Sequence, residues 1–210
     1  VEKDNNHEDV AHVTLTKFSE NTSRDLIQSL KKLEDENIDS IVLDVRNNPG
    51  GVLTGALEVA NIFVPEGKPI MQSEERDQKE PTTYNASKEL GSYKFNGNVV
   101  LLVDEGSASA SEILAGALQS IGIPVIGSTT FAKGTIQSIH PLALSKGELK
   151  ITIGRWLTAN GKQINEVGIT PDEVVELEIP EVMYGISPNK NYQLDEVSSD
   201  VENIKKVLKY

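Results

Sequence analysis

Apolar and polar residues follow a simple pattern in the first part of the chain. From Val10 to Phe18 they alternate, which is typical of a half-buried strand. Polar residues suited to a helix cap come next, and apolar residues then recur at the spacing of one helix face, at Leu26, Ile27, Leu30 and Leu33. This pattern predicts a strand followed by an amphipathic helix.

Short, continuous apolar runs replace the alternation further along the chain. They have the β-branched character of strands buried on both faces, and they lie at residues 38–45, 98–103 and 123–127. Helical patterns separate them, at residues 55–64 and 111–122. This rhythm predicts an α/β domain in which helices cover a sheet.

The rest of the chain is richer in predicted β-structure. Gly and Asn turns separate strand-like runs at residues 135–144, 148–158 and 172–179. The polar stretch 73–93 predicts a flap or mobile loop. In the C-terminal segment 183–210, residues 198–210 predict a short amphipathic helix.

The composition narrows the classes of protein and partner. The length of 210 residues suits a single domain spanning 1–210. A net charge of −12 argues against nucleic acid and anionic membrane surfaces as partners, and the absence of cysteine excludes disulfides and thiolate sites. No apolar run reaches membrane-spanning length. Because the chain starts at Val1 without a signal segment, we expect a piece of a longer protein.

Three serines stand at alternate positions in GSASASEILAGAL, where a strand-like run gives way to a helix. A nucleophile there would profit from the free N–H groups and positive dipole of a helix N-terminus. However, Ser109 with Glu112 also fits a capping box, and Ser107 and Ser111 fit ordinary residues of a first turn. This stretch alone leaves both interpretations open.

A lysine in the small-residue segment TTFAKGTIQ is the candidate base. Lys133 has Phe131 and Ile136 close by, a setting that could exclude water, and a lysine accepts a proton only when its amine is neutral. Gln137 lies four positions later and could face the same point. A phosphate-binding loop is rejected because Ala132 stands where that motif needs glycine.

The segment LDVRNNPGG follows another predicted strand. Its two glycines let the backbone approach a ligand closely and turn N–H groups outward, as in an oxyanion hole. A plain tight turn is the alternative. The histidines give weaker signals: His7 and His12 lack the zinc-binding HExxH spacing, and we expect no metal site. His140 could form a conventional triad with Ser109, but no aspartate stands out as its partner.

Four segments, in this order, resemble the signature of the carboxyl-terminal processing (tail-specific) serine peptidases: LDVRNNPGG, VDEGSASASEILAGAL, TFAKGTIQ and GITPDEVVE. The resemblance runs from about Val10 to Val175. It implies an α/β fold with a ClpP- and crotonase-like ββα core and a β-rich C-terminal part. It also implies cleavage of proteins near their C-termini, without a cofactor.

The same resemblance implies the site residues. The middle serine, Ser109, corresponds to the nucleophile, Lys133 to the base and Gln137 to its orienting partner. The oxyanion N–H groups would come from two places in the chain, namely Ala110 and either Gly50 or Gly51. Ser107 and Ser111 are then expected to be local hydrogen-bonding residues at the helix entrance.

Two departures from the family pattern accompany these implications. Ala132 stands where members usually carry glycine, and the chain has no room for the PDZ domain that captures a substrate's free C-terminus. We therefore expect a protease core that acts on proteins or peptides, located in the cell envelope or secreted, with oligomers possible. A catalytically impaired scaffold and a crotonase-like acyl-transfer enzyme are the alternatives.

Overall fold

A six-stranded sheet forms one layer of the part of the chain that the computed structural model describes, residues 2–4, 7–76, 78–142 and 147–175. Its strands, in spatial order, are β1 (Glu2–Asp4), β2 (His7–Thr14), β3 (Ser40–Asp44), β6 (Asn98–Val103), β7 (Val125–Gly127) and β10 (Glu173–Val174). All neighbours are parallel except β1 and β2. The carboxyl ends of β3 and β6 therefore meet at one edge, where ligands bind in α/β sheets.

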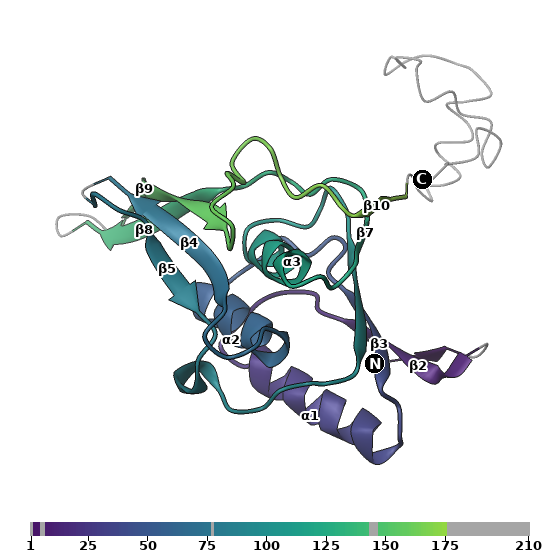
Figure 1. The fold of residues 1–210 in the computed structure, drawn as a ribbon. Helices are drawn as coiled ribbons and strands as arrows, with labels where there is room; N and C mark the ends of the chain where they lie inside the picture. Colours follow the sequence, from purple (N-terminus) through teal and green to yellow (C-terminus); the bar gives the residue numbers. More distant parts are fainter. Residues whose placement is uncertain (1, 5–6, 77, 143–146, 176–210) are drawn as a thin grey trace, which may run out of the picture. The chain divides into compact units, whose positions relative to one another are not determined.

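Three α-helices follow strands of this sheet, as the apolar spacing predicts. They are α1 (Thr22–Asp35), α2 (Leu53–Phe63) and α3 (Ala110–Ser120). The buried stripe of α1 is Leu26, Leu30 and Leu33, whereas most of α3 is buried. The reason is that α3 contacts β6 and β7 on one side and β4 and β9 on the other, so it lies between two sheets (Figure 1).

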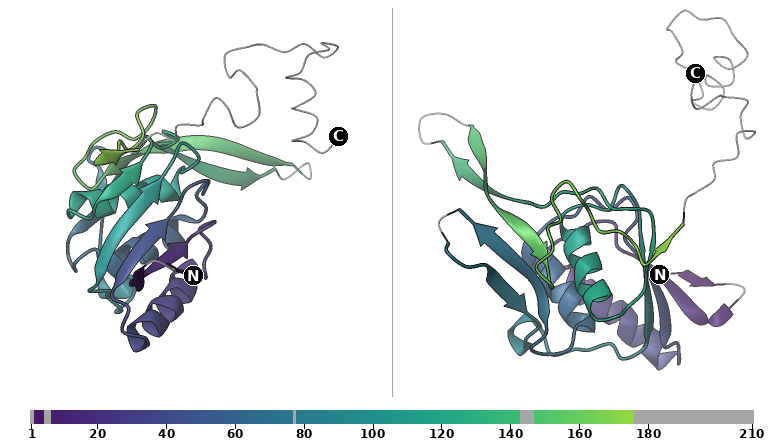
Figure 2. Two further views of the ribbon diagram at one scale, coloured as in Figure 1. Left: turned by 90° about the vertical axis from the view of Figure 1, so that its right-hand side faces the viewer. Right: turned by 45° about the horizontal axis from the view of Figure 1, so that its top comes forward.

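The second sheet is antiparallel and has four strands in the described part of the chain. Their spatial order is β5 (Thr82–Asn85), β4 (Pro69–Glu75), β9 (Glu148–Thr158) and β8 (Thr135–Pro141). The hairpin of β8 and β9 extends well beyond β4 and β5 (Figure 2). Both predicted strands of this hairpin are confirmed, although β8 ends three residues before its predicted limit.

Two expectations need correction. Residues 73–93 are not a loop: they contain the end of β4, all of β5 and a short 3-10 helix, η1 (Lys88–Leu90). The polar sequence misled because β5 is an edge strand whose side chains are mostly exposed. The strands predicted to be buried on both faces are fully covered on one face only, since Val42, Val100 and Leu102 on the other face are partly exposed.

Fewer of the expectations for the C-terminal part of the chain can be compared with the structure. The predicted run 172–179 is represented by β10, and the segment 183–210 with its predicted helix lies outside the described residues. Among the described residues, none of the helices is long and apolar enough to cross a membrane.

Candidate active site

Ser109 occupies the junction between β6 and α3. It is the N-cap residue of α3 and has φ 56° and ψ −109°, a conformation that is unusual for a residue with a side chain. Such backbone strain costs on the order of 1–3 kcal/mol and persists only where the surroundings enforce it. The strained turn leaves Ser109 partly exposed at the start of the helix.

The three serines differ sharply in their environment. Ser107 and Ser111 are fully buried, and their hydroxyls donate to the carbonyl oxygens of Val45 at 2.7 Å and Asn48 at 2.9 Å. Both are hydrogen-bonding residues, as expected. Ser107 also has a local partner, since its hydroxyl accepts the Asp104 N–H at 3.0 Å, whereas the carbonyl acceptors of both serines lie in the distant turn after β3. Ser109 is thus the serine of the three with a solvent-accessible side.

The turn after β3 is organised around Asn48, which is fully buried. Its amide nitrogen donates to the Leu15 carbonyl at 2.7 Å, and its side-chain oxygen accepts the Gly50 N–H at 2.9 Å. Its carbonyl also accepts the Ala108 N–H at 3.0 Å. One side chain and its backbone therefore join β2, the glycine turn and the entrance of α3.

The glycine turn lies directly against the segment that carries Ser109. A Cβ at Gly50 would lie 2.9 Å from the Ala110 nitrogen and 2.9 Å from the Ser109 Cβ, so no larger residue fits there. The Gly50 N–H is already bound to Asn48. The N–H groups of Gly51 and Ala110 have no hydrogen-bond acceptor among the described residues, which makes them the free donors near Ser109.

An ion pair between the buried Asp44 and the exposed Arg46 lies at the start of this turn. The Asp44 carboxylate accepts hydrogen bonds from the Arg46 guanidinium at 2.7 Å and from His12 Nε2 at 2.9 Å, and also from the Arg46 backbone N–H. Burial by itself would raise the pKa of Asp44, but these hydrogen bonds and the Arg46 charge hold it below its usual value. His12 therefore lies in β2 and binds a carboxylate.

Glu112 connects Ser109 to the loop that carries Lys133. It is fully buried, and its Oε2 accepts the Ser109 N–H at 2.7 Å and the Lys133 N–H at 3.0 Å. Its Oε1 accepts the Ala132 N–H at 2.8 Å and the Thr130 hydroxyl at 2.7 Å. Glu112, which the sequence suggested only as part of a capping box, thus also fixes the backbone of the segment that carries Lys133.

The side chains of the proposed base and its partner are held less firmly. Lys133 is partly exposed in the loop before β8, and Gln137 is exposed on β8 beside a β-bulge. No hydrogen bond joins Ser109, Lys133 and Gln137 through their side chains in this structure. Phe131 is 63% exposed, so it contributes little to excluding water from the lysine. His140 is exposed in the outer half of β8 and has no carboxylate partner among the described residues.

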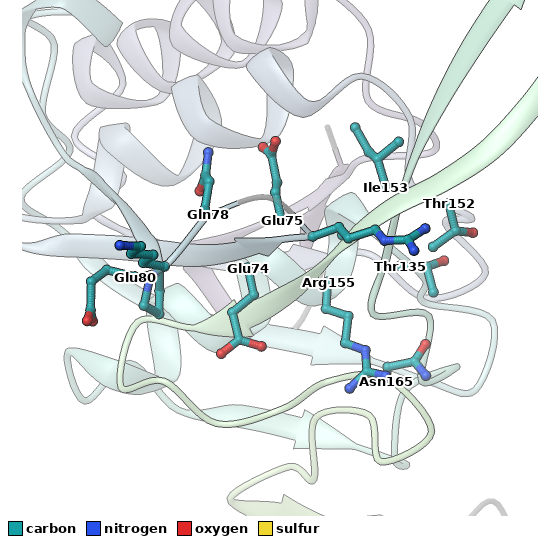
Figure 3. A pocket seen from close by; sticks show the side chains of 13 residues that line it. Glu74, Glu75, Gln78, Glu80, Thr135, Thr152, Ile153, Arg155 and Asn165 are labelled. Carbon is teal, nitrogen blue, oxygen red and sulfur yellow. The ribbon is translucent and has the colours of Figure 1, made fainter.

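A pocket of about 530 Å³ adjoins the lysine loop (Figure 3). Thr135 and Asn165 line the end of the pocket nearest Lys133, and a Cβ at Gly134 would lie 2.2 Å from the Asn165 nitrogen. Arg155 and Asn165, both labelled in Figure 3, are among its lining residues. In the described part of the chain, no group of three or more His, Cys, Asp or Glu residues is arranged to hold a metal ion.

Comparison with known proteins assigns the family. The model of peptidase family S41 matches residues 9–175. The chain belongs to peptidase family S41. It is 36% identical to the carboxy-terminal processing protease CtpA of Bacillus subtilis over 99% of this chain and 43% of that protein. It is also 39% identical to CtpB of the same organism over 77% of this chain and 33% of that protein.

A solved structure supports the same assignment. The chain is similar to the photosystem II D1 C-terminal processing protease, with a TM-score of 0.71 and 30% identity over 95% of this chain and 46% of that one. The resemblance noted in the sequence and the predicted fold class are both confirmed. The chain spans less than half the length of each of these relatives.

Sequence reasoning missed three residues that organise the site. Asn48 and Asp44 were quoted in a motif without a role, and Glu112 was given only a cap. A signal did exist: each is a polar residue at the end of a strand-like run or among apolar helix residues, where an unpaired polar group would be costly. The sequence does not show which residues pair with them. For Glu112, the partners in the lysine loop lie 20 or more residues further along the chain.

Proposed function

We propose that this S41 chain is the catalytic core of a serine endopeptidase that uses a Ser–Lys pair. Ser109 is the nucleophile, Lys133 the general base and Gln137 the residue that orients the lysine amine. Ala110 and Gly51 donate the oxyanion N–H groups; Gly50 is the weaker choice because Asn48 already accepts its N–H.

The observation that carries the proposal is the shared carboxylate oxygen of Glu112. It accepts the backbone N–H of Ser109 and that of Lys133, 24 positions apart, at 2.7 and 3.0 Å. Two segments that are distant in the chain are thereby held side by side. Partial exposure of Ser109, against full burial of Ser107 and Ser111, supports the same choice of nucleophile.

The proposed reaction needs no external reagent except water. Neutral Lys133 takes the proton of the Ser109 hydroxyl as Oγ attacks the substrate carbonyl carbon. The N–H groups of Gly51 and Ala110 stabilise the negative oxygen that forms, and the lysine proton passes to the leaving amine. Water then attacks the acyl-enzyme by the same route and releases the acid. The lysine amine must come within about 2.6–3.2 Å of Oγ for the first step.

The substrate class and location are finer proposals. The relatives are named carboxy-terminal processing proteases, and we propose that this protein likewise cleaves near free C-termini, in the cell envelope or after secretion. Comparison of one peptide with a free and an amidated C-terminus tests the first point. Equal cleavage of both peptides by the chain would contradict tail recognition by this core.

The central experiment removes each proposed group in turn. Ser109→Ala and Lys133→Ala should each abolish peptide cleavage while leaving the melting temperature nearly unchanged, since both side chains lie in the partly exposed site. Ser111→Ala is the matched control and should retain substantial activity. Activity should be insensitive to EDTA. An indispensable Ser111 or a dispensable Lys133 would refute the assignment.

A further inference from the structure

Thr130 is a buried polar residue between β7 and β8 to which the proposed mechanism gives no role. It belongs to TTFAKGTIQ, the segment that also carries Lys133, and its exposed fraction is 5%. Burial of a hydroxyl to this degree is costly unless its hydrogen bonds are satisfied. The partners of this hydroxyl therefore indicate what the residue does.

The Thr130 hydroxyl takes part in two hydrogen bonds. Its oxygen accepts the Ile169 N–H at 2.8 Å, and it donates to Glu112 Oε1 at 2.7 Å. A backbone N–H can only donate, so the Thr130 oxygen must be the acceptor in the first bond, and its single proton is available for the second. Thr130 thus connects the Ile169 N–H to the Glu112 carboxylate.

The Ile169 end of this connection is anchored in the core. Ile164 and Ile169 are 1% and 4% exposed, and the Gly168 N–H donates to the Ile164 carbonyl at 2.8 Å, which closes a turn between them. The Thr130 N–H also donates to the Ile169 carbonyl at 3.2 Å. A Cβ at Gly168 would lie 2.8 Å from the Thr130 carbonyl oxygen. Two hydrogen bonds and close packing therefore hold Thr130 against the turn 164–169.

The Glu112 end leads to the backbone of the proposed site. Oε1 accepts the Thr130 hydroxyl and the Ala132 N–H. Oε2 accepts the N–H groups of Ser109 and Lys133. The last torsion angle of a glutamate side chain has a broad energy minimum, so its hydrogen bonds decide how the carboxylate is turned. Without the Thr130 hydroxyl, Oε1 loses the donor that is fixed to the turn 164–169, and the carboxylate can rotate away from its bridging geometry.

We infer that Thr130 is a positioning residue for the proposed Ser–Lys site. Its hydroxyl fixes the orientation of the Glu112 carboxylate, and the carboxylate in turn fixes the backbone at Ser109 and Lys133. The inference rests on the proposed peptidase function, because that function gives these two positions their roles in catalysis. Thr130 acts through Glu112 and not on the substrate, so its loss should lower kcat and leave KM unchanged.

Paired substitutions separate the hydroxyl from the shape of the side chain. Thr130→Val keeps the shape and removes the hydroxyl, whereas Thr130→Ser keeps the hydroxyl and removes the methyl group. In Thr130→Val we expect kcat to fall at least about tenfold with KM within about twofold of wild type, since a misplacement of about 1 Å can cost about a hundredfold in rate. Thr130→Ser should keep kcat within about threefold of wild type, because it retains the donor.

Ser23→Ala is the matched control. It also removes a largely buried hydroxyl that donates to a carboxylate, in this case that of Glu58 on α2. It should lower the melting temperature, as Thr130→Val does, but should leave kcat unchanged. If Thr130→Val does not fold, Thr130→Cys replaces it, since a thiol is a weaker donor and acceptor than a hydroxyl. The kcat of Thr130→Cys should then lie below that of Thr130→Ser.

Amide hydrogen exchange, read residue by residue, tests the positioning without any cleavage. In Thr130→Val, or in Thr130→Cys if that variant replaces it, exchange at the Ser109 and Lys133 N–H groups should become at least about tenfold faster, because local opening there becomes easier. The Leu30 amide inside α1 should exchange as in wild type. Equal acceleration at Leu30 would indicate a general loss of stability and would overturn the inference.

The remaining outcomes separate this inference from the proposed function. Cleavage by the wild type, with unchanged kcat and unchanged exchange at Lys133 in Thr130→Val, would overturn the inference and leave the function standing. An equal loss of kcat in Thr130→Ser and Thr130→Val would also overturn it, because the hydroxyl would then not be the cause. If the wild type cleaves no peptide, the proposed function fails, and the exchange rates at Ser109 and Lys133 alone decide whether Thr130 positions their backbone.

Discussion

The proposed nucleophile, Ser109, and the proposed base, Lys133, belong to regions that are held together in opposite ways. Around Ser109, the polar residues Asp44, Asn48, Ser111 and Glu112 are nearly or fully buried, and each has hydrogen-bond partners in another segment. Beyond Lys133, β8 and the outer half of β9 carry apolar side chains that are largely exposed and share one long hairpin.

This contrast separates two requirements of the reaction. The nucleophile's backbone and the oxyanion N–H groups must be fixed before substrate arrives, because preorganised donors stabilise charge without rearranging. In the proposed mechanism, the Lys133 side chain and β8 form the adjustable region. The backbone of the lysine loop is held by Glu112 and by further backbone hydrogen bonds, such as that from the Glu166 N–H to the Ala132 carbonyl. The predictions below test this division by weakening the fixed region first.

Removal of Glu112 should have the largest effect. Glu112→Ala leaves four donors without their acceptor in a buried site, and we expect a loss of about 3–5 kcal/mol in the free energy of unfolding. Peptide cleavage should fall at least a hundredfold. Urea denaturation measures the loss of stability, and kcat measures the loss of cleavage.

Ser111→Ala is the control for Glu112→Ala, because it removes one buried hydrogen bond from the same helix turn and should cost only about 1 kcal/mol. Glu112→Gln separates charge from shape, since it keeps one carbonyl acceptor. If Glu112→Ala unfolds at the same urea concentration as wild type, the bridge does not stabilise the site.

Asp44→Asn should have the next largest effect, about 1–3 kcal/mol at neutral pH, because it weakens the hydrogen bonds from Arg46 and His12. The pKa of Asp44 is lower in the folded chain than its usual value. Its contribution is therefore fully present above about pH 4, the range of an unfolded aspartate, and is lost as pH falls through the folded pKa.

The difference in free energy of unfolding between wild type and Asp44→Asn should consequently become smaller as the pH falls. Urea unfolding at neutral pH and near pH 3 measures it, with the exposed Asp35→Asn on α1 as the control. A difference that is constant with pH would mean that the Asp44 charge does not contribute to stability.

The two regions also differ in how far sequence could predict them. The apolar period located α1, α2, α3 and the strands between them, because burial of one face dictates that period. The motifs proposed Ser109 and Lys133, which the fold brings close through Glu112. The polar hairpin at 73–93 was missed because edge strands with exposed side chains lack an apolar period. The roles of Asn48 and Asp44 depend on partners from other strands, which no local pattern reveals.

Gln137→Ala tests the adjustable region and should have a smaller effect than the changes around Ser109. Gln137 orients the lysine amine in the proposed mechanism and takes no proton itself, so we expect kcat to fall roughly tenfold, less than the loss of an acid–base group. Stability should not change, since the side chain is exposed. Thr152→Ala, directly across the ladder from Gln137, is the control. An equal loss in both variants would indicate a hairpin effect rather than orientation of the base.

Ala132→Gly should have the smallest effect, and it tests the point where the two regions join. Ala132 has φ 72°, a left-handed conformation in which a Cβ is unfavourable, yet its N–H binds Glu112 and its carbonyl accepts the Glu166 N–H at 2.9 Å. Glycine would keep both hydrogen bonds and relieve the strain, so the free energy of unfolding should rise by about 0.5–1 kcal/mol.

Activity distinguishes strain relief from a functional change at Ala132. Asn37→Gly relieves a similar left-handed conformation, φ 59°, at an exposed position just after α1, and should raise stability without changing cleavage. If hydrogen bonds rather than the Ala132 methyl group fix the lysine loop, Ala132→Gly should also leave kcat within about twofold of wild type. A several-fold rise in kcat in Ala132→Gly but not in Asn37→Gly would contradict this, because it would mean that the Ala132 methyl group holds the loop of Lys133 away from its productive position.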